Sequence, residues 1–230
     1  NGEYFLSFNG TSFVWSTVTF DFKQLQIAFV YRDGVNVCLR ECHGLQDWQS
    51  HEANHNNVGT VLRSGADVAG FTLNSDVVAN RRPTISQALV YDEDLPSNLL
   101  ALTNGLYTRL FLDGANNANF ETDKTDIVEY TSGNRFLYNR FTGGVWTKAT
   151  AANNQYAKIF LMAIPTTSDA DCQKSRYVWI MPQTVNATLL TIQALAPSSV
   201  NLGQISTALA EYVFVQEFII RATSRGWIII

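Results

Sequence analysis

Three residues match a known catalytic pattern: His51, Glu52 and His55 fit H-E-x-x-H. In zinc peptidases a helix places both imidazoles on the metal, one turn apart, and the glutamate activates a water molecule. The flanking residues, 47–50 and 56–59, are rich in poor helix formers and turn residues. Because they do not predict the helix that the motif needs, a zinc-dependent hydrolase is only a minor alternative for this chain.

The histidines and cysteines are unusually clustered. All three histidines and two of the three cysteines lie between positions 38 and 55. Cys42, His43, His51 and His55 offer four nitrogen and sulfur ligands, a set that suits tetrahedral zinc. Their spacing fits no zinc-finger pattern, so a polar surface loop is the favoured interpretation and we predict no metal. The odd number of cysteines excludes a complete disulfide framework.

Asp92, Glu93 and Asp94 supply neighbouring carboxylates of the kind that glycosidases use. They lie at the start of residues 94–102, where a capping residue, an early proline and a later glycine predict a short helix. We therefore favour helix capping over acid–base catalysis for these acids. The sequence has no nucleophile elbow, phosphate-binding loop or dinucleotide-binding glycine motif, and we predict a protein that is not an enzyme and binds no cofactor.

Aromatic residues beside amide-rich loops are the stronger candidates for function. Trp48 lies among glutamines in the loop 44–57, and Tyr156 follows two asparagines and a glutamine. Flat rings pack against the C–H faces of sugars while amides bind the hydroxyl groups. The predicted ligand-binding residues are Trp48, Gln49, His51, His55, Asn57 and Tyr156. Trp146 is instead expected in the core, on a strand.

A β-hairpin over residues 24–40 should present the loop that contains Trp48. Asp33-Gly34 separates two runs rich in β-branched and aromatic residues, which predicts a two-residue type I′ turn. In that register Val30 faces Val37 and Phe29 faces Cys38, so both faces of the ribbon are apolar. The hairpin is therefore expected at the centre of a sheet, covered on both sides, as a rigid support for the loop.

Similar turn signals recur along the chain, at Asn9-Gly10, Asp113-Gly114 and Gly143-Gly144. Many short strands separated by turns predict an all-β fold with a minor helical part, an antiparallel β-sandwich or barrel. Residues 188–195 are the second of two short predicted helices. At 230 residues the chain can form one domain, and we expect a single β-rich domain over residues 1–230.

Composition narrows the class of partner. Charged residues make up 16% of the chain, against roughly 25% in ordinary soluble domains, and the formal net charge is −4. Without a run of Lys or Arg, nucleic acid is an unlikely partner. No apolar stretch reaches the roughly 20 residues that span a bilayer, so no membrane insertion is expected. A neutral polar surface of this kind is typical of extracellular and virion proteins.

The aromatic strand patterns in residues 138–146, 156–164, 177–183 and 217–228 allow a comparison with a known family. Together they resemble the C-terminal tip domains of phage-type tail fibres and related bacterial surface fibres. The resemblance implies a homotrimer that binds a receptor at a cell surface and forms the C-terminal part of a longer fibre polypeptide. It implies no particular site residues, because the family has no fixed catalytic set and its binding loops vary.

The sequence therefore leads us to expect an extracellular adhesin, a receptor-binding fibre tip that recognises a cell-surface glycan or protein. A structural component of a virion or fibre, without ligand binding, is the first alternative. The apolar ending Ile228-Ile229-Ile230 adds to the expectation of a trimer, since neighbouring copies would cover it.

Overall fold

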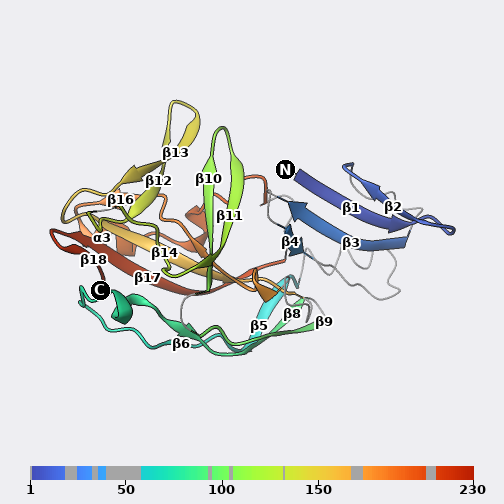
Figure 1. Ribbon diagram of the computed structural model, residues 1–230, viewed down its shortest axis with the longest axis horizontal. Helices are drawn as coiled ribbons and strands as arrows, with labels where there is room; N and C mark the ends of the chain where they lie inside the picture. Colours follow the sequence, from blue (N-terminus) through green and yellow to red (C-terminus); the bar gives the residue numbers. More distant parts are fainter. Residues whose placement is uncertain are drawn as a thin grey trace.

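The computed structural model describes residues 2–18, 25–32, 36–39, 58–92, 95–103, 106–131, 133–166, 173–205 and 211–230. Strands hold 53% of these residues and helical turns 8%, which confirms the predicted all-β class with a minor helical part. The strands of these ranges form several sheets and no closed barrel, so the sandwich-like alternative is the one observed (Figure 1).

A seven-stranded sheet lies at the centre of the fold, in the order β11-β10-β15-β14-β17-β18, with β16 paired to β14. Its neighbours are antiparallel except β10 and β15, which run parallel. The strands are β10 (Tyr107–Asp113), β11 (Asn117–Lys124), β14 (Tyr156–Ala163), β15 (Tyr177–Ile180), β16 (Val185–Asn186), β17 (Val213–Thr223) and β18 (Gly226–Ile229).

The central sheet is buried on both faces, which explains why β14 is apolar at nearly every position. Ile159 and Leu161 point into a first core, which also contains Trp179 and Trp227. Phe160 and Met162, at the alternate positions, point into a second core with side chains from β10 and β11. Burying each such side chain contributes roughly 1.5–3 kcal/mol, so this strand anchors the whole domain.

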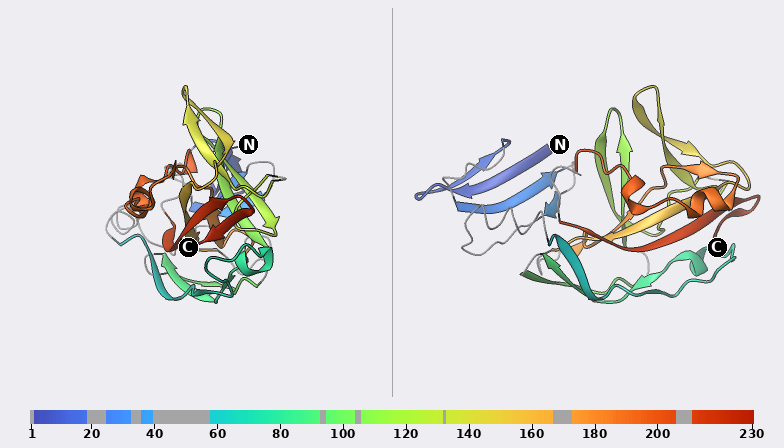
Figure 2. Two further views of the ribbon diagram at one scale, coloured as in Figure 1. Left: turned by 90° about the vertical axis from the view of Figure 1, so that its left-hand side faces the viewer. Right: turned by 180° about the vertical axis from the view of Figure 1, so that it is seen from behind.

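Smaller sheets cover the first core on one side of the central sheet (Figure 2). One is three-stranded, in the order β5-β8-β9, and the other pairs β6 with β7. Val90 of β8 and Leu99 of β9 are fully buried against the central sheet. The bounds are β5 (Thr60–Gly65), β6 (Val68–Ala69), β7 (Thr84–Ile85), β8 (Ala88–Asp92) and β9 (Leu95–Leu99).

The helix predicted over residues 94–102 is wrong, because residues 95–99 form strand β9. Pro96 pairs with Tyr91 across the sheet, and the missing amide hydrogen is tolerated because β9 is the edge strand. The capping role predicted for Asp92 is therefore also wrong. Its carboxylate accepts a hydrogen bond from the Thr60 hydroxyl at 3.5 Å, across the β5–β8 pair, while Glu93 and Asp94 lie outside the described residues.

A four-stranded antiparallel sheet at the N-terminal end stands beside the central body, in the order β2-β1-β3-β4 (Figure 1). Its strands are β1 (Gly2–Phe8), β2 (Phe13–Ser16), β3 (Leu25–Arg32) and β4 (Asn36–Leu39). Phe5 of β1 packs against the second core. The sheet is therefore joined to the central body through the face that carries Phe5.

The predicted hairpin of β3 and β4 is confirmed, but its register is wrong by one residue. Val30 pairs with Cys38 and Phe29 with Leu39, whereas Val37 and Cys38 were the predicted partners. The last pair is Arg32 with Asn36, and Asp33 and Gly34 lie outside the described residues. Moreover, β4 is the outermost of the described strands of this sheet, whereas the hairpin was predicted to lie centrally.

The turn predicted at Gly143-Gly144 has the expected geometry. Thr142 pairs with Val145, so two residues join β12 (Leu137–Thr142) to β13 (Val145–Thr150). Their φ angles are +63° and +83°, as a type I′ turn requires. The hairpin rises from the central sheet and contributes Trp146 to the second core, which confirms the prediction that this residue lies in the core.

Helical turns are short and lie at the margins of the sheets. The predicted second helix is confirmed as α3 (Leu189–Gln193), with Thr188 at its N-cap position. Pro197–Ser199 forms the 3-10 turn η2, and Val78–Arg81 forms η1.

The apolar C-terminal strand is covered by the chain itself. Trp227, Ile228 and Ile229 of β18 are buried, and β18 is the last strand of the central sheet. Groups from residues 74–81 bind its outer edge: the Asn74 amide donates to the Ile229 carbonyl at 2.7 Å, and the Arg81 guanidinium donates to the Trp227 carbonyl. Covering this strand therefore needs no second copy, which removes one of the two reasons for expecting a trimer.

Candidate ligand-binding surface

Most of the residues predicted to bind a ligand fall outside the described ranges. This applies to Trp48, Gln49, His51, His55 and Asn57, and also to the H-E-x-x-H glutamate between them. Tyr156 is described, at the start of β14, where it is half-buried. The Arg221 guanidinium lies 5.9 Å from the centre of its ring. The structure thus places one predicted residue in a half-buried strand position and tests none of the others.

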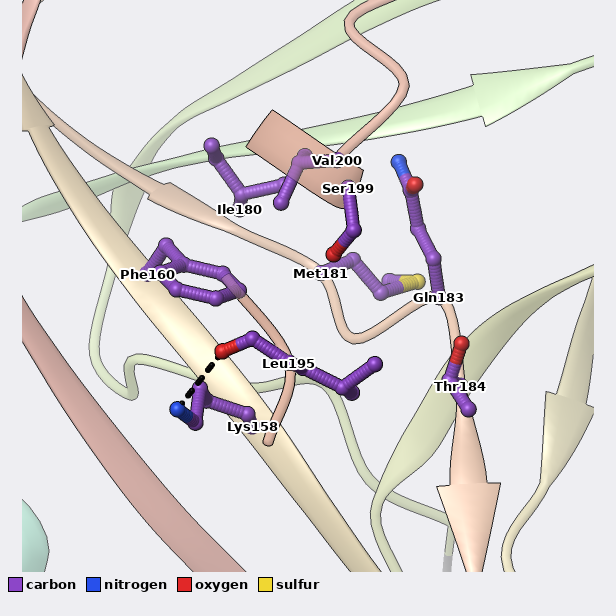
Figure 3. Close-up of a pocket in the computed structure, with 9 residues that line it drawn as sticks. All are labelled: Lys158, Phe160, Ile180, Met181, Gln183, Thr184, Leu195, Ser199 and Val200. Carbon is purple, nitrogen blue, oxygen red and sulfur yellow. Dashed lines mark hydrogen bonds between the residues drawn. The ribbon is translucent and has the colours of Figure 1, made fainter. Parts of the chain in front are cut away.

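A small cavity beside β14 is shown in Figure 3. Its lining includes Lys158, Phe160, Gln183 and Ser199, and its volume is about 20 Å³. That space holds about one water molecule and no organic ligand. An open groove of about 250 Å³ is also lined by Phe160, together with Phe214 and Pro197 of η2, and its volume falls below the usual ~300–1,000 Å³ of small-molecule pockets.

Lys158 is a structural residue of this region. Its side chain is only 2% exposed, and its ammonium group donates to the carbonyls of Gln193 and Leu195 at 2.9 and 2.7 Å (Figure 3 shows the second bond). A third partner is the Glu217 carboxylate at 2.9 Å. The charge therefore lies at the C-terminal end of α3, where carbonyl groups point outward and a cation is favourable.

A charged network links the hairpins above the central sheet. Glu121 of β11 accepts hydrogen bonds from Arg109 and, at 3.0 Å, from Lys148, which also binds Glu129. The Lys148 ammonium lies 3.7 Å from the centre of the Phe111 ring. Burial alone would raise the pKa of Glu121, but the Lys148 hydrogen bond and the Arg109 charge outweigh it and hold that pKa below 4.5. These charges neutralise one another, as in a structural network.

The largest exposed aromatic side chains of the N-terminal sheet lie together on one face. Phe13 and Trp15 alternate along β2 and are 66% and 56% exposed. They pair with Phe8 and Leu6 of β1, and cross-strand partners point to the same side of a sheet. The Phe8 and Phe13 rings lie 5.4 Å apart. We call this set, completed by the half-buried Tyr4, the β1–β2 platform.

The opposite face of this sheet points toward the body of the protein. Phe5 and Ser7 occupy the alternate positions of β1; Phe5 packs against the second core, and Ser7 is buried. The period of two residues along a strand therefore divides β1 into an anchoring side and a solvent side. The platform is the solvent side of a sheet whose other side is anchored.

Side-chain hydrogen bonds fix both ends of β2. The Asn9 side-chain oxygen accepts from the backbone amides of Thr11 and Ser12 at 3.0 and 2.9 Å, which closes the β1–β2 turn. After the strand, the Ser16 hydroxyl donates to the Val18 carbonyl at 2.8 Å and accepts from the Val18 amide at 2.9 Å. Such local bonds define the conformation of the turns, so the two rings project from a fixed backbone.

Two properties of the described ranges concern metal sites and membrane-spanning helices. None of their His, Cys, Asp and Glu side chains forms a group of three or more that could hold a metal ion. None of the helices in these ranges has the length and apolar character needed to cross a bilayer. The feature most suited to function in this part of the chain is therefore the exposed platform, which sequence analysis did not identify as a site.

No protein-family model, curated protein or solved structure matches this chain.

Proposed function

We propose that this protein is an adhesin, a receptor-binding domain that recognises a glycan or protein at a cell surface. The observation that carries the proposal is the exposure of Phe13 and Trp15, side by side on an anchored sheet. Large aromatic side chains are costly to expose and are enriched where proteins bind partners. The resemblance to fibre tips adds the proposal of an extracellular location, on a virion tail or a cell-surface fibre.

A surface platform also suits the modest size of the two hollows beside Phe160. The cavity beside Lys158 holds about one water molecule, and the neighbouring groove is open. Recognition of a receptor needs neither, because a flat or convex patch with a few aromatic anchors is sufficient. The alternative of a structural fibre component requires no exposed platform, and for this reason we favour the adhesin.

Binding of the fluorescently labelled 230-residue chain to a panel of bacterial and eukaryotic cells tests the proposal. An adhesin gives saturable binding that excess unlabelled protein displaces, and the double variant Phe13→Ala/Trp15→Ala lowers it. Phe141→Ala is the matched control, since Phe141 is a 55% exposed aromatic residue on a different hairpin. A structural component assembles normally and gives no saturable binding to any cell of the panel.

The homotrimer remains a prediction that rests on the resemblance alone. Light scattering coupled to size-exclusion chromatography measures it directly. A mass of three chains of 25.6 kDa is the expected result, and a monomer at micromolar concentration contradicts it.

A further inference from the structure

We infer that the β1–β2 platform binds a neutral carbohydrate, with Trp15 and Phe13 packing against the C–H faces of sugar rings. This inference rests on the proposed adhesin function and names the class of its ligand. It follows from three properties of the platform: its charge, its area and the rigidity of its support.

The platform has no charge of its own. Residues 4–18 include no Asp, Glu, Lys or Arg, and they contain all five platform residues, the whole of β2 and the part of β1 that follows Glu3. Recognition of phosphate, sulfate or carboxylate depends on cationic side chains, and recognition of basic peptides depends on acidic ones. A ligand that gains binding energy from this surface must be uncharged where it touches it.

The two exposed rings give an apolar area much smaller than a whole protein interface. A buried aromatic side chain accounts for about 150–250 Å², so the exposed fractions of Phe13 and Trp15, 66% and 56%, correspond to about 200–300 Å². A stable protein–protein interface buries about 800 Å² on each partner. An area of two rings suits a short saccharide, whose hydroxyl groups supply the rest of the binding energy through hydrogen bonds.

The polar groups around the rings are the kind that sugars bind. Asn9, Thr11 and Ser12 lie in the turn before β2, and they offer amide and hydroxyl groups without charge. This turn is closed by its own side-chain hydrogen bonds. Little conformational entropy is lost when such a surface binds, which favours a weak, small ligand such as a sugar.

Affinity electrophoresis in native gels tests the inference with defined polymers. The gels contain one neutral polysaccharide, taken from dextran, mannan, galactan and β-glucan, or one charged polymer, polygalacturonate or heparin. We expect retardation of the 230-residue chain by at least one neutral polymer and by neither charged one. Trp15→Ala should weaken the apparent affinity about tenfold or more, while Phe141→Ala leaves it unchanged.

Two further variants separate stacking from general hydrophobicity. Trp15→Phe keeps an aromatic ring and should retain most of the affinity for the polysaccharide. Trp15→Leu keeps an apolar side chain without a ring, and its affinity should fall about as far as that of Trp15→Ala. A thermal melt of each variant shows whether the fold is intact. If Trp15→Ala fails to fold, the comparison of Trp15→Phe with Trp15→Leu decides the question.

Several results would overturn the inference. The first is retardation of the protein by a charged polymer only, and the second is the lack of retardation by every neutral polymer. The third is an affinity for the neutral polymer that stays unchanged in all Trp15 and Phe13 variants. A wild-type dimer that Trp15→Ala converts to a monomer would show instead that the platform joins two copies. The protein could also bind cells saturably and have no affinity for any neutral polysaccharide. That result would refute the carbohydrate inference but not the adhesin proposal.

Discussion

The side-chain amide of Asn139 makes two hydrogen bonds with the backbone of Leu112. The Leu112 amide donates to the Asn139 oxygen at 2.6 Å, and the Asn139 NH₂ group donates to the Leu112 carbonyl at 2.7 Å. Asn139 is fully buried on β12, and Leu112 is fully buried on β10. The amide therefore replaces a missing strand partner and joins the β12–β13 hairpin to the central sheet.

Asn139→Asp should destabilise the fold by about 2–4 kcal/mol. The substitution removes the NH₂ donor, leaves the Leu112 carbonyl without this partner and places a carboxylate in a fully buried position. Urea unfolding followed by tryptophan fluorescence measures the loss. Asn153→Asp, at an exposed position, is the matched control and should change the free energy of unfolding by less than about 0.5 kcal/mol. Equal effects of the two variants would refute the role of Asn139.

The Lys158–Glu217 pair should respond unequally to the loss of either partner. Lys158→Met leaves the carbonyls of Gln193 and Leu195 without this donor, and we expect a loss of about 2–4 kcal/mol. Glu217 is 48% exposed, so Glu217→Gln lets water replace the ion pair and should cost less than about 1 kcal/mol. Thermal and urea unfolding of both variants provide the comparison.

Lys174→Met is the control for this pair, because Lys174 is 46% exposed and lies 4.0 Å from Asp123. It should leave the free energy of unfolding nearly unchanged. If Lys158→Met is as mild as Lys174→Met, Lys158 does not hold the end of α3.

Sequence patterns predicted those parts of the fold that local geometry decides. Gly143-Gly144 is an example, because a two-residue type I′ turn needs positive φ at both positions and glycine adopts it without strain. The hairpin of β3 and β4 was predicted from its Asp-Gly pair, but the predicted register was wrong by one residue. Pairing across the whole sheet sets that register.

The strand β9 shows where local signals mislead. Asp94, Leu95 and Pro96 have the composition of a helix start, and the segment was predicted as a helix. In the folded chain its residues pair with β8, and Leu99 is fully buried in the first core. The gain from that burial depends on strands far away in the sequence, and it outweighs a preference that is worth only a fraction of a kcal/mol per residue.

The platform was missed for a related reason. Alternation in Phe13-Val14-Trp15-Ser16 predicts a strand with two unlike faces, but it does not indicate which face meets solvent. That depends on the partner strand β1, where Phe5 and Ser7 face the protein body. The absence of charge over residues 4–18 was the signal that could have pointed to this segment.

Acid should weaken the contribution of Glu121 to stability. Because its pKa is held below 4.5 in the folded state, the ionised group stabilises the fold above the unfolded-state pKa. That contribution is lost as the pH falls through the lower, folded-state pKa. We expect the melting temperature of Glu121→Gln to be lower than that of the wild-type protein at about pH 6. This difference in melting temperature should shrink toward about pH 3. A difference in melting temperature that stays constant over this range contradicts the prediction.

Gly65 should tolerate no side chain. Its φ angle is +77°, and an added Cβ would lie 1.9 Å from the carbonyl oxygen of Gln87, a backbone atom on the neighbouring chain segment. That segment continues into β8, where Ala88 pairs with Gly65 and is itself buried, so the backbone has no room to retreat. Gly65→Ala should therefore cost more than about 3 kcal/mol or prevent folding.

Gly143→Ala separates the two causes of that cost. Gly143 has a similar φ of +63°, but an added Cβ there meets nothing within 4 Å. The substitution carries the left-handed backbone strain alone, about 1–2 kcal/mol, because the turn projects into solvent. Urea unfolding of both variants gives the difference between them, which measures the steric clash at the β5–β8 pair. Equal losses would mean that φ alone decides, and that β5 and β8 are less closely packed at Gly65 than the structure indicates.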